Sequence, residues 1–145
     1  QAVHLPVIAA GGIATPAGVA AAKALGAAAV QIGTAYLCSH EATTSALHRN
    51  ALQSSAAEHT ALTTLFTGRP ARGIVNRVMR ELGPIPPKVP AFPLATADMA
   101  PLRAAAEAQG SSDFTPLWAG QNTSGCRTAA AADITRDFLK AWLAA

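Results

Sequence analysis

The sequence is poor in cysteine, in aromatic residues and in charge, and it has no long apolar run. Two cysteines, Cys38 and Cys126, stand among 145 residues without CxxC spacing. This pattern excludes a disulfide scaffold and predicts a reduced, cytoplasmic compartment, with Cys126 an inert thiol. The longest alanine-rich stretch, residues 17–30, is interrupted by glycine and lysine. It is therefore not expected to span a bilayer, and we predict no membrane partner.

Patterns that usually carry catalysis or metal binding are also missing. The four histidines lack HxxxH or HExxH spacing, so no metal site is predicted. No Ser/His/Asp or Cys/His motif is present, and paired carboxylates are not evident. We therefore assign no catalytic residue, and we expect His48 on an exposed helix face.

The positive charge is concentrated in one short segment. The net charge is +3, and the excess falls within residues 67–81, which contain four arginines and one glutamate. Because the chain has no long basic stripe with interleaved aromatic residues, no nucleic-acid partner is predicted. The pattern favours a solvated helix face, with contact to a phosphate or an acidic partner as the alternative.

Two short apolar strands that end in glycine are the most informative feature that is present. Leu5–Ala10 is a continuous apolar run, and Ala28–Ile32 is a second one. Between them Thr15 and Pro16 are good helix-start residues, and Gly26 is a good helix end. The pattern predicts a right-handed βαβ unit whose parallel strands are covered on both faces.

Glycine at the ends of neighbouring parallel strands is typical of a phosphate site. Gly11 and Gly12 follow the first strand, and Gly33 and Thr34 follow the second. Without Cβ atoms the backbone N–H groups can close on an anion, and the Thr34 hydroxyl can add a further bond. Gln31, within the second strand, either points at the ligand or bonds to the backbone inside the fold.

The rest of the chain is predicted to be mainly helical. Helices are expected over Ala42–Ser54, Ile74–Leu82, Pro101–Gln109 and Ala129–Ala144, with an extended proline-rich connection over 83–93. The segment Trp118–Gln121 resembles another strand-to-loop junction. There Gly120 and Gln121 either approach a ligand or form an ordinary turn.

Parallel strands that end in glycine at a phosphate site are found in (β/α)8 barrels, and such a barrel needs about 250 residues. Two strands cannot close one, so we expect this chain to hold only its last part. Gln1 stands directly before a strand and is not an initiating methionine, which fits a cut through a larger protein.

The chain contains, in this order and with plausible spacing, the segments Pro6–Ile13, Ala24–Ala27, Val30–Cys38, Thr67–Asn76 and Leu117–Gln121. These segments resemble the carboxyl-terminal part of nitronate monooxygenases, formerly called 2-nitropropane dioxygenases. The resemblance spans nearly the whole chain.

The resemblance implies an FMN-binding TIM (β/α)8 barrel with a small, mostly helical inserted domain. Residues 1–44 would then hold the last two barrel strands, 45–112 the inserted domain, and 113–145 the return to the barrel and the final helix. The glycine-ended strands would hold the FMN phosphate, with Gly120 and Gln121 near the flavin.

Enzymes of this family oxidise alkyl nitronates with O₂ to carbonyl compounds and nitrite. Their catalytic histidine belongs to a Gly-Gly-His segment, which this sequence lacks, so that residue is expected outside the chain. Two alternatives stay open: an FMN-dependent enoyl-acyl carrier protein reductase, and a non-catalytic phosphate-binding half-barrel. A half-barrel would leave strand edges unpaired and would tend to form homo-oligomers or aggregates.

Overall fold

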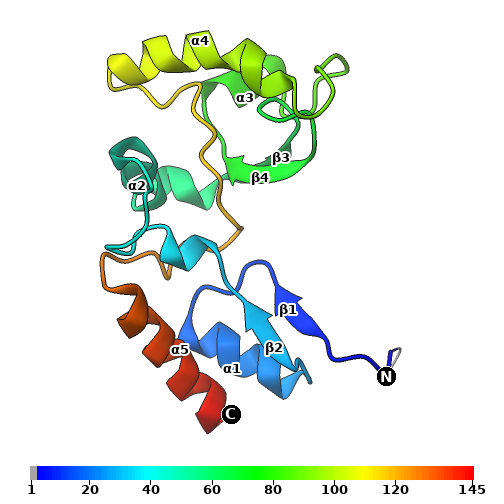
Figure 1. Ribbon diagram of the computed structural model, residues 1–145, viewed down its shortest axis with the longest axis vertical. Coiled ribbons are helices and arrows are strands. Elements are labelled where there is room, and N and C mark those ends of the chain that lie inside the picture. The colour runs from blue at the N-terminus through cyan, green and yellow to red at the C-terminus, as the bar shows by residue number, and fades with distance from the viewer. Residues whose placement is uncertain (1–2) are drawn as a thin grey trace. The chain divides into compact units, whose positions relative to one another are not determined.

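The computed structural model describes residues 3–145. The chain divides into two compact units, Gln1–Thr43 with Asn122–Ala145, and Thr44–Gln121. We call them unit 1 and unit 2 and describe each by itself (Figure 1).

Unit 1 is built on a parallel βαβ crossover. Strands β1 (Ile8–Ala10) and β2 (Ala29–Gln31) pair in parallel and are connected by helix α1 (Pro16–Ala24). The Thr15 hydroxyl accepts a hydrogen bond from the Gly18 N–H at 3.2 Å, as expected of an N-cap. Gly26, just past the helix end, has φ +92°, which explains why glycine stands there. The βαβ unit predicted from the sequence is confirmed.

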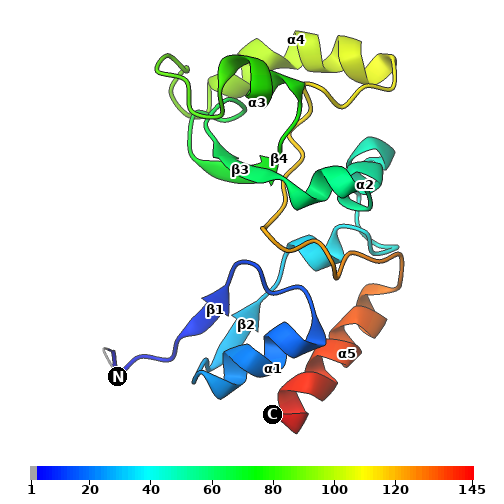
Figure 2. The ribbon, with the colours of Figure 1, turned by 180° about the vertical axis from the view of Figure 1, so that it is seen from behind.

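Helix α5 (Ala131–Ala144) supplies the other half of this core. Ile134 and Phe138 are buried against Val19 of α1 and Ala35, and Trp142 packs at the edge of the cluster. Both ribbon views show α1 and α5 side by side (Figures 1 and 2). The face that α5 buries is therefore an apolar stripe of Ile134, Phe138 and Trp142, spaced four residues apart.

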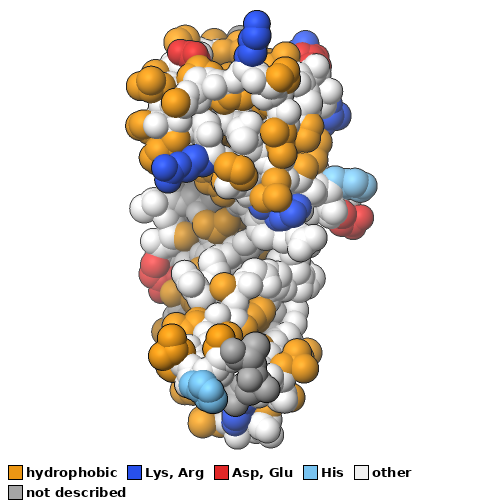
Figure 3. Space-filling model, turned by 90° about the vertical axis from the view of Figure 1, so that its right-hand side faces the viewer, with side chains coloured by type: hydrophobic (Ala, Val, Ile, Leu, Met, Phe, Trp, Pro, Cys, Tyr) orange, Lys and Arg blue, Asp and Glu red, His pale blue; other side chains and the backbone are white. Residues whose placement is uncertain are grey.

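The two strands are not covered on both faces, so that prediction was wrong. Along β1 the residues alternate exposed, half-buried, exposed, and the Ile8 side chain is 61% exposed. Only one face of this two-stranded sheet is covered. Exposed apolar side chains are spread over the face of the molecule in Figure 3.

Unit 2 combines helices with an antiparallel hairpin. Its elements are α2 (Ala46–Leu52), a 3₁₀ turn η2 (Ser55–Glu58), β3 (Thr60–Thr63), β4 (Ala71–Ile74), α3 (Arg77–Leu82) and α4 (Ala95–Ala108). Strands β3 and β4 pair antiparallel. A core cluster of Leu65, Phe66, Val78 and Met79 lies beside them.

The sequence does not predict this hairpin, because in β3 a polar side chain is buried and an apolar side chain is exposed. In β3 the Leu62 side chain is 45% exposed while Thr63 is fully buried. The polar residue therefore faces the core, where its hydroxyl accepts a hydrogen bond from the Leu65 N–H at 3.1 Å. Unit 2 is thus less helical than the sequence suggested.

Three helix boundaries also differ from the sequence-based expectation. The helix expected to begin at Pro101 begins at Ala95 and contains that proline. Its first turn is held because Ala95 is buried and the Thr96 hydroxyl donates to the Phe66 carbonyl at 2.9 Å. The expected helix 74–82 begins at Arg77 because Ile74 ends β4, and the expected helix 42–54 is confined to α2.

Within residues 3–145 no helix combines the length and the apolar character needed to cross a membrane. Over the same residues no three His, Cys, Asp or Glu side chains gather in a way that could hold a metal ion.

Candidate functional site

The ends of β1 and β2 lie side by side, and both run into predicted site residues. Ala10 pairs with Gln31, so Gly11 and Gly12 emerge next to Gly33 and Thr34. The register thus brings together the five candidate residues of unit 1.

Gly11 and Gly12 have backbone conformations that favour glycine. Their φ angles are +93° and +71°, in the left-handed region that other residues rarely adopt. A Cβ at either position would meet nothing within 4 Å. The demand for glycine therefore comes from the backbone conformation, and the space beside both residues is open to a ligand.

Gly33 has a different reason to be glycine. Its φ of −111° is accessible to any residue, and a Cβ there would also meet nothing within 4 Å. The absent side chain leaves the backbone open to close approach. Thr34 then begins the 3₁₀ turn η1 (Thr34–Tyr36), which packs through the buried Ala35.

Gln31 is the last residue of β2 and is exposed. It does not lie in the interior of a covered strand. Its contact with a ligand stays a prediction.

Gly120 and Gln121 follow a short segment that extends the hairpin of unit 2. The Ile74 N–H donates to the Leu117 carbonyl at 2.8 Å, and the Ala119 N–H donates to the Arg72 carbonyl at 3.1 Å. Gly73 forms an antiparallel bridge with Trp118. The strand-like character expected of this segment is present, whereas a ligand contact by Gly120 or Gln121 stays a prediction.

His48 holds this segment from α2, and the expectation of an exposed histidine was wrong. Its Nε2 lies 2.9 Å from the Trp118 carbonyl oxygen, so Nε2 carries the proton and donates. The side chain is half-buried. Burial lowers the pKa of His48, and the bond to Trp118 opposes that shift in part. No sequence pattern signals this contact.

Asn76 is a second residue whose structural role no sequence pattern signals. It is buried, and its amide donates to the carbonyls of Ser112 at 3.2 Å and Thr115 at 2.9 Å. Its Oδ1 accepts from the Met79 N–H at 3.4 Å and caps α3. The last residue of the motif 67–76 therefore fastens α3 to the chain that leads to Trp118.

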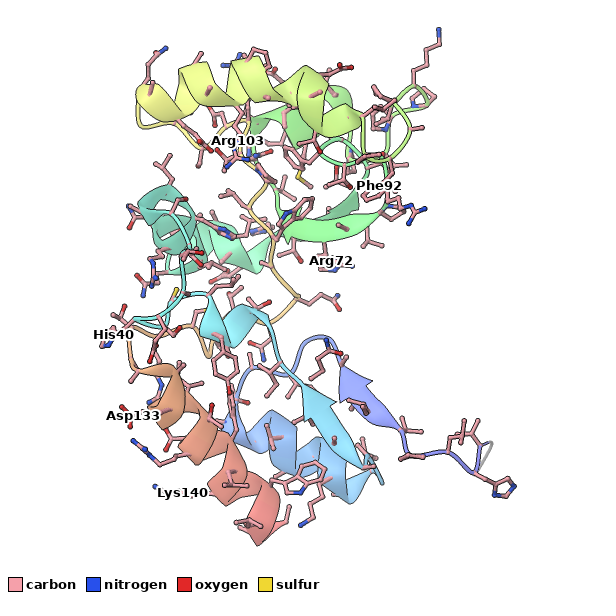
Figure 4. All side chains as sticks on the ribbon, viewed as in Figure 1. His40, Arg72, Phe92, Arg103, Asp133 and Lys140 are labelled. Carbon is pink, nitrogen blue, oxygen red and sulfur yellow. The ribbon has the colours of Figure 1, made fainter. Side chains whose placement is uncertain are left out.

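The arginines of residues 67–81 each have a separate environment. Arg72 donates to the hydroxyl and carbonyl oxygens of Thr60 at 3.2 and 3.3 Å. Arg69 lies over the ring of Phe92, the residue labelled in Figure 4, at 4.6 Å from the ring centroid. On α3, Arg77 pairs with Glu81 at 2.7 Å. The expected solvated helix face therefore describes Arg77 but not Arg72, which is half-buried on β4.

Cys126 lies next to the candidate site residue Thr34. Its thiol donates to the Thr34 carbonyl at 3.2 Å, and burial raises the pKa of Cys126 to about 12. The neighbouring Arg127 does not activate it, because that side chain pairs with Asp137. The thiol is protonated at neutral pH, in keeping with the expectation of an inert cysteine.

The strand ends of unit 1 form a neutral, glycine-lined site that suits an anion bound by backbone N–H groups. Among residues 3–145 we assign no group to proton transfer. The geometry therefore defines a glycine-ended pair of parallel strands in an α/β protein, and phosphate binding there stays a prediction.

The sequence pattern of the nitronate monooxygenase family matches residues 1–140. A nitronate monooxygenase of Pseudomonas aeruginosa is 41% identical over 137 residues, which are 94% of this chain and 39% of that protein. This chain belongs to the nitronate monooxygenase family, whose named members are enzymes.

Solved structures agree with this assignment. Nitroalkane oxidase from Streptomyces ansochromogenes matches with a TM-score of 0.86 at 39% identity, over 98% of this chain and 40% of that one. FabK from Thermotoga maritima matches with a TM-score of 0.69 at 28% identity, over 98% of this chain and 45% of that one. The chain thus spans about two fifths of the length of these proteins.

Proposed function

We propose that this chain is the phosphate-binding part of an FMN-dependent nitronate monooxygenase. The enzyme would oxidise an alkyl nitronate with O₂ to a carbonyl compound and nitrite. The observation that carries the proposal is the pair of positive-φ glycines, Gly11 and Gly12, beside the open end of β2. The resemblance of these segments to nitronate monooxygenases indicates that the ligand is FMN.

The residues fit the phosphate of FMN. Gly11, Gly12 and Gly33 leave open space where side chains would otherwise stand. Backbone N–H groups of these residues and the Thr34 hydroxyl would hold the phosphate, and Gln31 would contact the flavin from the end of β2. When bound, FMN supplies the redox chemistry, and the chain binds and orients it.

The domain assignment is part of the same proposal. Residues 1–44 would provide the last two strands of a TIM barrel, 45–112 an inserted domain, and 113–145 the return and final helix. The exposed apolar side chain of Ile8 on β1 supports it, because the remaining barrel would cover such a side chain.

Gly120 and Gln121 are proposed as further flavin contacts. Support comes from the segment before them, which is held to β4 by backbone hydrogen bonds and to α2 by His48. A segment fixed in this way can present its last residues with little loss of conformational freedom. The catalytic histidine is proposed to belong to the part of the enzyme outside this chain.

The first experiment compares FMN with riboflavin as ligands of a protein that contains this chain, by quenching of flavin fluorescence. FMN should bind at least about tenfold more tightly, since riboflavin lacks the phosphate. Gly11→Ala should remove that preference. Gly26→Ala is the matched control, because Gly26 has almost the same φ, +92°, but stands at the other end of α1.

Equal affinity for the two flavins would contradict the phosphate assignment. Loss of the preference in the Gly26 variant would show that the Gly11 effect is only general strain.

The second experiment assays O₂ uptake and nitrite release with propionate-3-nitronate. Nitrite release supports the proposed activity. FMN binding without nitrite, together with NAD(P)H consumption on an enoyl thioester, would instead support the enoyl-acyl carrier protein reductase alternative. FMN binding without either reaction would favour a non-catalytic phosphate-binding protein. Gel filtration of the same sample tests the expectation of a homo-oligomer.

A further inference from the structure

The carbonyl of Trp118 points away from β4, and His48 binds it from the other side. The hydrogen bonds between this segment and β4 are made by the Leu117 carbonyl and the Ala119 N–H. Trp118 is therefore the bridge residue whose own N–H and carbonyl face outward from the antiparallel pair. Nε2 of His48 lies 2.9 Å from that carbonyl oxygen. His48 thus satisfies a backbone acceptor that β4 cannot reach.

His48 is itself held in place by α2. The Ser45 hydroxyl caps this helix and accepts a hydrogen bond from the His48 N–H at 3.3 Å. Leu52, the last residue of α2, is buried. The imidazole is half-buried on a side chain with few rotatable bonds, so little conformational entropy is lost when it bonds to Trp118. The helix therefore presents the donor at a fixed position.

Trp118 stands shortly before Gly120 and Gln121, the two residues that are proposed to contact the flavin. Its indole ring meets the buried Phe66 edge-on, with 5.6 Å between the ring centroids. The carbonyl and the side chain of Trp118 are thus both fixed. Only the buried Ala119 separates this carbonyl from Gly120. Because peptide planes are rigid, a displacement of the carbonyl moves the residues that follow it.

We propose that His48 is a positioning residue for flavin binding. It acts through the Trp118 carbonyl, which fixes the places of Gly120 and Gln121. The inference rests on the proposed function, because it takes these two residues as flavin contacts. It goes further in assigning to His48 an effect on the portion that FMN and riboflavin share. The phosphate is assigned to other residues, Gly11 among them, so the preference for FMN over riboflavin does not depend on His48.

Two substitutions separate the hydrogen bond from the rest of the side chain. In His48→Gln the amide nitrogen can take the place of Nε2 and donate to Trp118. In His48→Asn the side chain is shorter by a methylene group, and its amide cannot reach the carbonyl. Both variants are compared with the unaltered protein that contains this chain. Quenching of flavin fluorescence gives the affinities, with FMN and riboflavin as the probes.

The asparagine variant should weaken the binding of both flavins by the same factor, about fivefold, because the unheld segment must be ordered when the flavin binds. The preference for FMN should be unchanged. His48→Gln should bind both flavins within about twofold of the unaltered protein. His48→Ala answers the same question should the asparagine variant not fold, since alanine favours a helix.

A double-variant cycle tests whether His48 acts through the end of the segment. Gln121→Ala alone should also weaken the binding of both flavins. When it is combined with His48→Asn, the loss of affinity should be clearly smaller than the product of the two separate losses, since the contact removed is already misplaced. A loss equal to that product would mean that the two residues act independently, and it would overturn the proposal.

Thr115→Val is the matched control for a loss of stability. Thr115 lies earlier in the same segment, and its hydroxyl donates to Glu107 at 2.8 Å. A hydrogen bond between β4 and Leu117 stands between Thr115 and Trp118, so the end of the segment should keep its place. This variant should melt at a lower temperature, as His48→Asn should, and yet bind both flavins as the unaltered protein does.

The outcomes distinguish the failure of this inference from that of the proposed function. An unaltered protein that binds neither flavin overturns both. Where the unaltered protein binds flavin, equal affinity in His48→Asn overturns the positioning role alone. So does equal weakening by His48→Gln, because the hydrogen bond would then not matter, or by Thr115→Val, because general destabilisation would explain the effect. Loss of the FMN preference in His48→Asn would place its effect at the phosphate and would likewise overturn the proposal.

Discussion

Gly125 lies so close to Ala14 that a Cβ at position 125 would overlap the Ala14 carbonyl oxygen. The chain that returns from unit 2 therefore packs directly on the turn between β1 and α1. Because backbone atoms cannot yield as a flexible side chain can, glycine is required here for space.

Gly125→Ala should lower the free energy of unfolding by about 3 kcal/mol. Urea denaturation followed by circular dichroism measures this. The matched control is Gly18→Ala within α1, where a Cβ would meet its nearest neighbour, Thr15 Oγ1, at an ordinary 3.5 Å. That variant should be neutral or more stable by up to about 1 kcal/mol. Equal effects of the two substitutions would contradict the close approach.

Asn76 predicts a second loss of stability, this time in unit 2. Asn76→Ala should cost about 2 kcal/mol, because the buried Thr115 carbonyl loses its Asn76 donor and the half-buried Ser112 carbonyl loses one of its two donors. Asn76→Asp should cost more, since a carboxylate would face two carbonyl oxygens. Asn50 on α2 is exposed, so Asn50→Ala should change stability by less than about 0.5 kcal/mol. Thermal unfolding of the three variants and of the unaltered protein measures these differences in stability.

The local signals explain how much of unit 1 could be predicted. Thr15, Pro16 and Gly26 mark the ends of α1 by their own backbone chemistry, and the stripe on α5 marks its buried face. Gly11 and Gly12 stand out in the sequence because they lack side chains, and their positive φ angles are a second reason for glycine at these positions. Each of these features depends on residues close together in the sequence.

The missed features depend on residues that are far apart. His48 meets Trp118, which is 70 positions away, and Asn76 meets Thr115, which is 39 positions away. No local pattern records such contacts. Strand β3 was missed for a related reason, because only the tertiary structure shows that Thr63 faces inward and Leu62 outward.

His48 predicts a pH dependence of stability. Its pKa is lowered in the folded state by burial, so the unfolded chain takes up a proton more readily as the pH falls. Stability should therefore be greatest above the unfolded pKa of about 6.5 and should fall as the pH drops below it. Urea unfolding from about pH 7.5 to about pH 5.5 measures the effect above the range in which exposed carboxylates titrate.

His48→Gln should flatten this dependence, because glutamine can still donate to Trp118 but does not titrate. His59 is exposed, so His59→Gln should leave the dependence unchanged. A His48 variant with the same slope as the unaltered protein would show that another group is responsible.

Cys126 predicts an unusual pH profile for alkylation. Because burial raises its pKa to about 12, the thiolate fraction should grow about tenfold for each pH unit from about pH 7 to about pH 10. The rate of modification by iodoacetamide, followed by mass spectrometry of peptide 104–127, should rise in parallel. In urea the same cysteine should instead level off above about pH 8.5. Cys126→Ser should take up almost no label in the folded state, since Cys38 is fully buried. A profile that levels off near pH 8.5 in the folded protein would mean that Cys126 is not buried against the Thr34 carbonyl in solution.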